Sequence, residues 1–177
     1  MRDSGFLPLL GLCLAALLGA CNNLSSTPMA AATVDYNRNY DFSHVHKIAI
    51  QPIARDTVET MMVSDVQISS LNEALTAELE QRGFQVATGN SYADMFLYWR
   101  FVPEESATVS TFDPATQKIT EATIYVDMID PVILQTVWRA NFRAHLDDQT
   151  DTSGAAEYSR QAAAAMLAQF PPNPIEP

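Results

Sequence analysis

TVWRANFRAHL, residues 136–146, alternates between apolar or small side chains and polar ones along its whole length. Because successive side chains of a β-strand point to opposite faces, this pattern predicts a strand with one face against a core. The inward set is expected to be Trp138, Ala140, Phe142, Ala144 and Leu146, and the outward set Arg139, Asn141, Arg143 and His145. The stretch therefore predicts a half-buried strand of a sheet.

The segment before this strand predicts its hairpin partner. An apolar-rich stretch runs to Ile129 and is followed by Asp130-Pro131, a turn signal. Matching the apolar faces of the two strands places Val126 opposite Trp138. The same register pairs Ile124 with Ala140, Met128 with Thr136, Glu121 with Arg143 and Tyr125 with Arg139. A shift of one residue is disfavoured because it would turn the apolar side chains to the wrong face.

Residues 94–102 (DMFLYWRFV) are apolar on both faces, which predicts a central strand covered on each side. If Phe96, Tyr98 and Val102 instead lie uncovered opposite the helices, they indicate a surface for a partner. Shorter strands are predicted at residues 33–36, on an edge of the sheet, at residues 47–54, where Pro52 ends or bulges the ladder, and from residue 84.

Two stretches have the helical period. In Ser64–Arg82 an apolar stripe recurs at spacings of three and four residues, and Gly83 follows where a left-handed cap favours glycine. The stripe consists of Ile68, Leu71, Leu75 and Leu79. Ser153–Phe170 is an alanine-rich second helix, whose small residues permit close packing on a sheet and which the following prolines stop.

These elements predict an α+β fold, because the order β-α-β-β-β-β-α lacks the regular alternation of a doubly wound sheet. We expect an antiparallel-rich sheet of about five strands with the two helices packed against it. No internal repeat or second linker interrupts the chain. Residues 33–172 are therefore predicted to form a single domain, followed by a loose tail at residues 173–177.

The N-terminal segment predicts a signal peptide over residues 1–20. Arg2 precedes an apolar run, residues 6–18, which is too short for a span of about 20 residues. Residues 18–21, Leu-Gly-Ala-Cys, resemble the bacterial lipobox, which implies cleavage before Cys21 and fatty chains such as palmitate on that residue. Each buried methylene contributes about 0.8 kcal/mol, so several chains anchor a protein durably. A plain signal peptide with an incidental cysteine and an uncleaved anchor helix are the alternatives.

The lipidated cysteine and the small, polar residues after it, residues 21–32, are predicted to form a flexible tether. The eleven residues after Cys21 reach at most about 40 Å at full extension, which keeps the domain near the bilayer. Asn22, and not aspartate, follows the cysteine. By resemblance to Gram-negative sorting signals, this favours the periplasmic face of the outer membrane.

Composition bounds the partners. The formal net charge of -11 makes nucleic acid a poor partner, because an acidic surface repels phosphates. Basic partners or cations fit this charge better, although it also serves simple solubility. Cys13 leaves with the signal peptide and Cys21 becomes lipidated, so we expect no disulfide and no free thiol.

His44 and His46 are the sharpest candidates for a metal site. In extended backbone both imidazoles point to one side, and Asp41 or a distant carboxylate would supply a third ligand. Two histidines that lead into a strand are more often surface groups. The acidic run at residues 147–151 lacks the glycine and glutamate of an EF-hand loop. A diagonal contact of Asp127 with Arg139 is expected to be structural.

The sequence contains no nucleophile elbow, activated cysteine or phosphate-binding glycine loop. We therefore expect no enzyme activity, no catalytic residue and no cofactor. The leading expectation is a membrane-anchored envelope lipoprotein that acts as a non-enzymatic binding or accessory module for a periplasmic protein. The alternative is a periplasmic metal- or small-ligand-binding protein, or an enzyme, that uses His44 and His46.

A series of short motifs resembles a known family. In order they are Val34-Asp35, Asp41-Phe42-Ser43, Arg82-Gly83-Phe84, Ala93-Asp94, Val126-Asp127 through Asp130, Val137-Trp138-Arg139 and Phe170-Pro171-Pro172. Their order and spacing, with the lipobox, resemble the bacterial lipoproteins grouped as domain of unknown function 4136. The resemblance implies an envelope lipoprotein with an α+β domain and implies no activity. This chain departs from the family pattern at two places. His44-Val45-His46 stands where the family usually has an aromatic residue, and Ala122 stands where a glycine is common.

Overall fold

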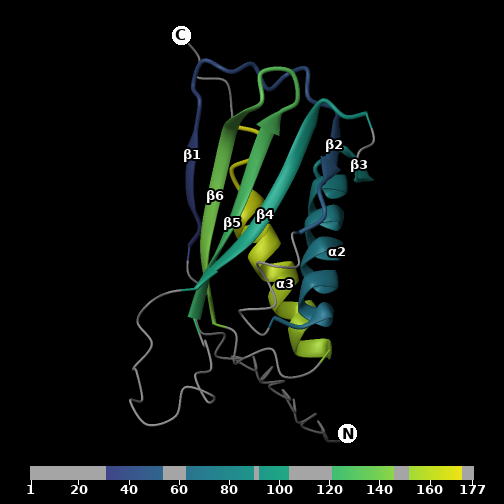
Figure 1. The fold of residues 1–177 in the computed structure, drawn as a ribbon, viewed down its shortest axis with the longest axis vertical. Coiled ribbons are helices and arrows are strands. Elements are labelled where there is room, and N and C mark those ends of the chain that lie inside the picture. Colours follow the sequence, from purple (N-terminus) through teal and green to yellow (C-terminus); the bar gives the residue numbers. More distant parts are fainter. Residues whose placement is uncertain (1–30, 54–62, 90–91, 104–120, 146–151, 173–177) are drawn as a thin grey trace, which may run out of the picture.

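A mixed sheet with both helices on one of its faces organises the described part of the chain (Figure 1). The computed structural model describes residues 31–53, 63–89, 92–103, 121–145 and 152–172. Its elements are β1 Thr33–Tyr36, β2 Lys47–Ile50, α2 Asp65–Gln81, β3 Gln85–Thr88, β4 Met95–Pro103, β5 Glu121–Asp130, β6 Gln135–His145 and α3 Thr152–Leu167. The strands lie in the order β1-β6-β5-β4-β2-β3.

The described residues form six strands, where the sequence predicted about five, and the sheet is less antiparallel than expected. β1, β6, β5 and β4 pair antiparallel, whereas β2 pairs parallel with both β3 and β4. The β2–β3 pair is parallel because a strand that is reached through a crossover helix re-enters the sheet in the same direction. The predicted edge strand is confirmed as β1, and β2 ends at Ile50, before Pro52.

Both predicted helices are confirmed, and α2 begins at a capping box. The Ser64 hydroxyl accepts a bond from the Gln67 backbone N–H at 3.2 Å, and the Gln67 side chain accepts one from the Ser64 N–H at 2.8 Å. The buried side of α2 carries Leu71, Ala74, Leu75 and Leu79. α3 ends at Leu167, three residues before the predicted end, and its fully buried Ala162 and Ala163 suit the close packing of α3 and α2.

The β5–β6 register differs by two residues from the predicted one. The observed pairs include Ile124–Phe142, Val126–Ala140, Met128–Trp138 and Ile129–Thr136. Between Met128 and Ile129 the ladder shifts, which leaves Val137 as an extra residue on β6. The predicted faces are nevertheless correct, because two residues make one period of a strand. Trp138, Ala140, Phe142 and Ala144 are all buried, and Leu146 lies outside the described residues.

The prediction that β4 is covered on both faces is wrong. Met95, Leu97, Trp99 and Phe101 are buried in the core. The alternate residues face the side of the sheet opposite the helices, where Tyr98 is 41% exposed, Val102 is 39% exposed and Phe96 is partly buried. Both helices lie on the other side (Figure 1), so the apolar pattern of β4 reports one buried face and one open face. We call this uncovered side the open face.

A row of alternating charges crosses the open face. Asp35 of β1 lies opposite Arg139 of β6, and Arg139 lies opposite Asp127 of β5, so the predicted Asp127–Arg139 contact is direct and not diagonal. Arg100 of β4 reaches Asp127 from the other side, and each arginine donates to a different carboxylate oxygen. The Asp127 side chain is only 5% exposed, whereas the two arginines are 42% and 43% exposed.

This difference in burial predicts unequal effects of substitution. Arg100→Met with Arg139→Met should lower the free energy of unfolding by about 3 kcal/mol, because the buried Asp127 carboxylate then lacks a partner. Asp127→Asn should cost only about 1 kcal/mol, because the half-exposed arginines can rehydrate. Urea unfolding followed by tryptophan fluorescence measures both. Equal losses would contradict a role of the arginines in neutralising a buried charge.

Candidate functional site

Several sequence-predicted features lie outside the described residues. They are the signal peptide, Cys21 and most of the tether, the acidic run at residues 147–151 and the tail from residue 173. The structure therefore places none of the lipidation chemistry. The remaining candidates are His44 and His46, the region between the C-terminus of α2 and the segment after α3, and the open face.

His44 belongs to a polar cluster with Tyr40 and Asp130. Its Nε2 lies 3.3 Å from the Tyr40 hydroxyl, which donates to Asp130 Oδ2 at 2.7 Å. His46 contributes its backbone N–H to Asp94 Oδ2 at 3.0 Å. Among the residues that the structure describes, no three His, Cys, Asp or Glu side chains are grouped so that they could hold a metal ion. Within the described ranges, therefore, no carboxylate joins the two histidines as a third ligand.

Asp130 joins this cluster to the β5–β6 turn. Its Oδ1 accepts the backbone N–H groups of Val132 at 2.7 Å and Ile133 at 3.1 Å. Burial alone would raise the pKa of Asp130, but the Tyr40 hydroxyl, these two amides and the charge of His44 together hold that pKa below its usual range. Burial and the bond to Asp130 raise the pKa of Tyr40. The cluster is therefore built around an ionised Asp130.

Because the pKa of Asp130 is lowered by folding, its contribution to stability is complete above the unfolded pKa and is lost as the pH falls below about 4. Tyr40→Phe removes one bond to the ionised carboxylate. The free energy of unfolding of this variant should therefore fall less between about pH 5 and about pH 3 than that of the unchanged chain. Urea titrations at each pH measure the difference. Tyr92→Phe, at a tyrosine that is 84% exposed, is the control, and identical slopes for both variants would contradict the assignment.

The C-terminus of α2 is closed by a Schellman motif that positions Arg82. Gly83 has φ +92, a left-handed conformation that favours glycine, and the N–H groups of Gly83 and Phe84 donate to Glu80 at 2.9 Å and Leu79 at 3.1 Å. Arg82 then reaches out from the cap. Its Nε and Nη2 donate to Glu78 Oε1 at 2.8 and 2.6 Å, and its Nη1 donates to the Phe170 carbonyl at 3.1 Å.

Phe170 is the centre of an aromatic cluster at this end of the domain. Its ring centroid lies 5.2 Å from that of Trp138, 5.4 Å from that of Phe84 and 6.0 Å from that of Phe42. Each of these residues belongs to one of the short motifs noted in the sequence. The motifs are far apart along the chain and meet in one cluster, so their shared structural role is to fix the segment after α3 against α2 and the sheet.

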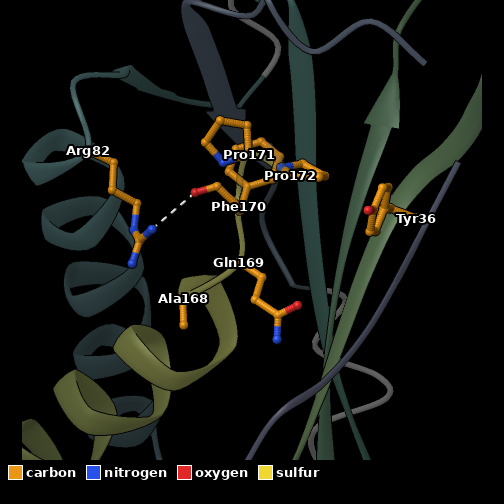
Figure 2. A pocket seen from close by; sticks show the side chains of 7 residues that line it. All are labelled: Tyr36, Arg82, Ala168, Gln169, Phe170, Pro171 and Pro172. Atoms are coloured by element: carbon orange, nitrogen blue, oxygen red, sulfur yellow. Dashed lines mark hydrogen bonds between the residues drawn. The ribbon is translucent and has the colours of Figure 1, made fainter. Parts of the chain in front are cut away.

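A cavity of about 570 Å³ lies beside this cluster (Figure 2). Its lining residues are Tyr36, Arg82, Ala168, Gln169, Phe170, Pro171 and Pro172. The walls come from β1, the C-terminus of α2 and the segment after α3, and the Arg82–Phe170 bond crosses one side. This volume is within the usual range of small-molecule sites. Sequence reasoning missed the cavity, although two motifs that line it, Arg82-Gly83-Phe84 and Phe170-Pro171-Pro172, were noted.

The open face is the second candidate site. Arg100 lies over the Tyr125 ring at 4.8 Å from the centroid, so this guanidinium contacts both an aromatic face and the Asp127 carboxylate. Next to this pair stand the exposed side chains of Tyr98 and Val102. The bond to Asp127 raises the pKa of Arg139, burial opposes this rise, and the charge of Asp127 adds to it. The face therefore combines fixed charges with aromatic and aliphatic surface.

The fold defines the class of protein as an α+β domain whose mixed sheet carries its helices on one face. Residues 32–172 match the family model described as "Domain of unknown function (DUF4136)". The chain belongs to this family, which confirms the resemblance of its motifs. No curated protein matches the sequence. Within the described residues, no helix is long and apolar enough to cross a membrane.

Solved structures share the fold. A PDZ domain protein from Parabacteroides distasonis aligns with a TM-score of 0.54 at 14% sequence identity, over 82% of this chain and 36% of that protein. A DUF4136 family protein from Bacteroides thetaiotaomicron aligns with a TM-score of 0.50 at 10% identity, over 79% of this chain and 95% of that protein. This chain therefore spans little more than a third of the first protein, and at these identities the likeness shows the fold alone.

Proposed function

We propose that this chain is a lipid-anchored envelope lipoprotein that acts as a non-enzymatic binding or accessory module, and that its open face docks a periplasmic protein. The observation that carries the proposal is the exposure of Tyr98 and Val102 beside the Arg100–Asp127–Arg139 group on the helix-free side of the sheet. Tyrosine and arginine are enriched at protein–protein interfaces, where aromatic side chains supply area and arginines supply directed bonds.

Charge favours a protein over a polyanion as the occupant of the open face. The row across the sheet contains Asp35, Arg139, Asp127 and Arg100, so its two carboxylates balance its two guanidinium groups. A surface that binds nucleic acid or anionic lipid carries a clear excess of cations. A neutral row with apolar neighbours suits a protein that offers both apolar side chains and paired charges.

The anchor supports a role at the envelope. The residues before and at Cys21 resemble a lipobox, and Asn22 favours the periplasmic face of the outer membrane by the resemblance given above. A short tether would hold the domain near the bilayer. Such an anchor suits a component of a membrane-bound assembly better than it suits an enzyme that must diffuse to its substrate. The ring of His44 contacts Tyr40, and no described carboxylate completes a metal site with it. We therefore give the histidines no role in the proposed function.

The anchor is tested by labelling cells with radioactive palmitate. The unchanged chain should incorporate label and sediment with membranes, and Cys21→Ser should lose both properties, because the thiol that accepts the lipid is gone. Cys13→Ser is the matched control and should still be labelled, since that cysteine lies within the predicted signal peptide. Label in the Cys21→Ser chain, or a mature N-terminus other than Cys21, would contradict the anchor.

The docking face is tested by cross-linking intact cells and identifying captured proteins by mass spectrometry. Tyr98→Glu with Val102→Glu should reduce the recovery of a specific partner by about tenfold or more, because two charges enter the apolar part of the interface. Ala77→Glu with Ala164→Glu adds the same charges on exposed positions of the helices and should leave recovery unchanged.

Thermal unfolding of both double variants separates loss of docking from loss of folding. All four replaced side chains are exposed, so the helix variant should melt close to the unchanged chain. The open-face variant should melt a few degrees lower but remain folded, because the new charge at position 98 stands opposite Asp127. Equal recovery of the partner with both folded variants would contradict docking through the open face. A chain that is recovered alone under all conditions would contradict the accessory role.

A further inference from the structure

The cavity beside Phe170 has polar groups on its walls that the fold does not use. Three of the N–H groups of Arg82 donate to Glu78 and to the Phe170 carbonyl. A guanidinium has five such groups, so one N–H on each terminal nitrogen remains. Within the part of the chain that the structure describes, the Tyr36 hydroxyl and the Gln169 side chain have no hydrogen-bond partner. All three side chains line the same cavity (Figure 2).

The rest of the wall is rigid and apolar. Pro171 and Pro172 stand across from Tyr36, and Ala168 lies below them on the same segment (Figure 2). Proline rings have almost no conformational freedom to lose, and Phe170 is held in place by three neighbouring rings. The cavity is therefore preformed, and a ligand that enters it orders few protein groups.

We propose that this cavity binds a small carboxylate with an apolar body. The carboxylate contacts Arg82, and the hydrocarbon packs on Ala168, Pro171 and Pro172. Tyr36 stands on the far wall, across the Phe170–Pro172 segment from Arg82 (Figure 2). This chemistry follows from the wall: Arg82 is the only charged side chain among the described lining residues, and its planar guanidinium suits a planar carboxylate. The site is distinct from the open face, because Tyr36 packs against the core on the helix-covered side of the sheet.

Glu78 makes the charge of the ligand testable. Its carboxylate already shares Arg82, so it opposes a second anion in the cavity. Glu78→Gln keeps an oxygen that accepts from Arg82 but removes the negative charge. Gln169→Glu does the reverse at an exposed position, because it adds a negative charge with almost no change of shape. A carboxylate ligand responds to the two substitutions in opposite directions, whereas a neutral ligand gains no affinity from Glu78→Gln.

The experiment uses the full mature chain in lipid nanodiscs and radiolabelled hexanoate in equilibrium dialysis, with empty nanodiscs as the blank. Binding should saturate at one site for each chain. Gln169→Glu should weaken it by about tenfold and Glu78→Gln should strengthen it by about threefold or more. Glu80→Gln, which makes the same charge change at an exposed position of α2, is the control and should leave the affinity unchanged. Hexanol, with the same hydrocarbon and no charge, should not compete.

Competition experiments distinguish two sources of the carboxylate, a peptide C-terminus and a free organic acid. An acetylated tripeptide that ends in leucine with a free carboxylate should displace hexanoate if the cavity accepts a peptide C-terminus, and its C-terminal amide should not. If neither peptide competes while hexanoate still binds, the ligand is a free organic acid. The proposal is overturned if hexanoate shows no saturable binding above the blank. It is overturned equally if Gln169→Glu binds as the unchanged chain does, or if Glu78→Gln matches Glu80→Gln.

Discussion

The burial of a single face of the sheet against α2 and α3 is the contact on which the rest of this structure depends. Trp99, Trp138 and Phe142 lie on that face together with the buried side of α2. Fully burying each large apolar side chain contributes about 1.5–3 kcal/mol, so this layer outweighs any polar contact in the molecule. The opposite face is left without helices in the described chain, so its side chains pair with one another or remain in contact with solvent.

On the open face, charged side chains neutralise one another, and no helix of the described chain buries them. Asp127 is almost inaccessible to solvent and would be costly there alone, but an arginine on each neighbouring strand supplies a counter-charge. The arginines remain half exposed, so they cost little to hold and keep contact with water. Two surfaces with different duties result: the helix side holds the fold together, and the other side presents a fixed pattern of charges and rings.

Patterns that act along a short stretch of chain were predictable from the sequence. The alternation in β6, the stripe of α2 and the glycine after its cap were all read correctly, because strand period, helix period and left-handed φ are local properties. The extra residue at Val137 was not predictable, since Val137 and Trp138 are both apolar and either could face the core. β4 was misread for a related reason, because an apolar side chain on an open face looks the same in sequence as a buried one.

The cavity was out of reach for sequence reasoning. Tyr36, Arg82 and Pro171 are separated by tens of residues, and only the packing of Phe170 brings them together. The two histidines show the converse: residues that are close in sequence need not form a site. Among the described residues, no third metal ligand lies beside them. His44 and His46 are close in sequence, but the carboxylates near them are engaged with Tyr40 and with backbone amides.

The shortness of the outer strands has a consequence for how copies of this protein tolerate crowding. β1 and β3, at the two margins of the sheet, have four residues each, whereas β5 and β6 in the interior have 10 and 11. An edge strand that short offers few unpaired backbone N–H and C=O groups, so a neighbouring copy can form few hydrogen bonds to it and aggregation through the sheet edges is disfavoured. Chains held close together, as the proposed anchor would hold them, would therefore stay separate at densities at which longer unpaired edge strands would associate.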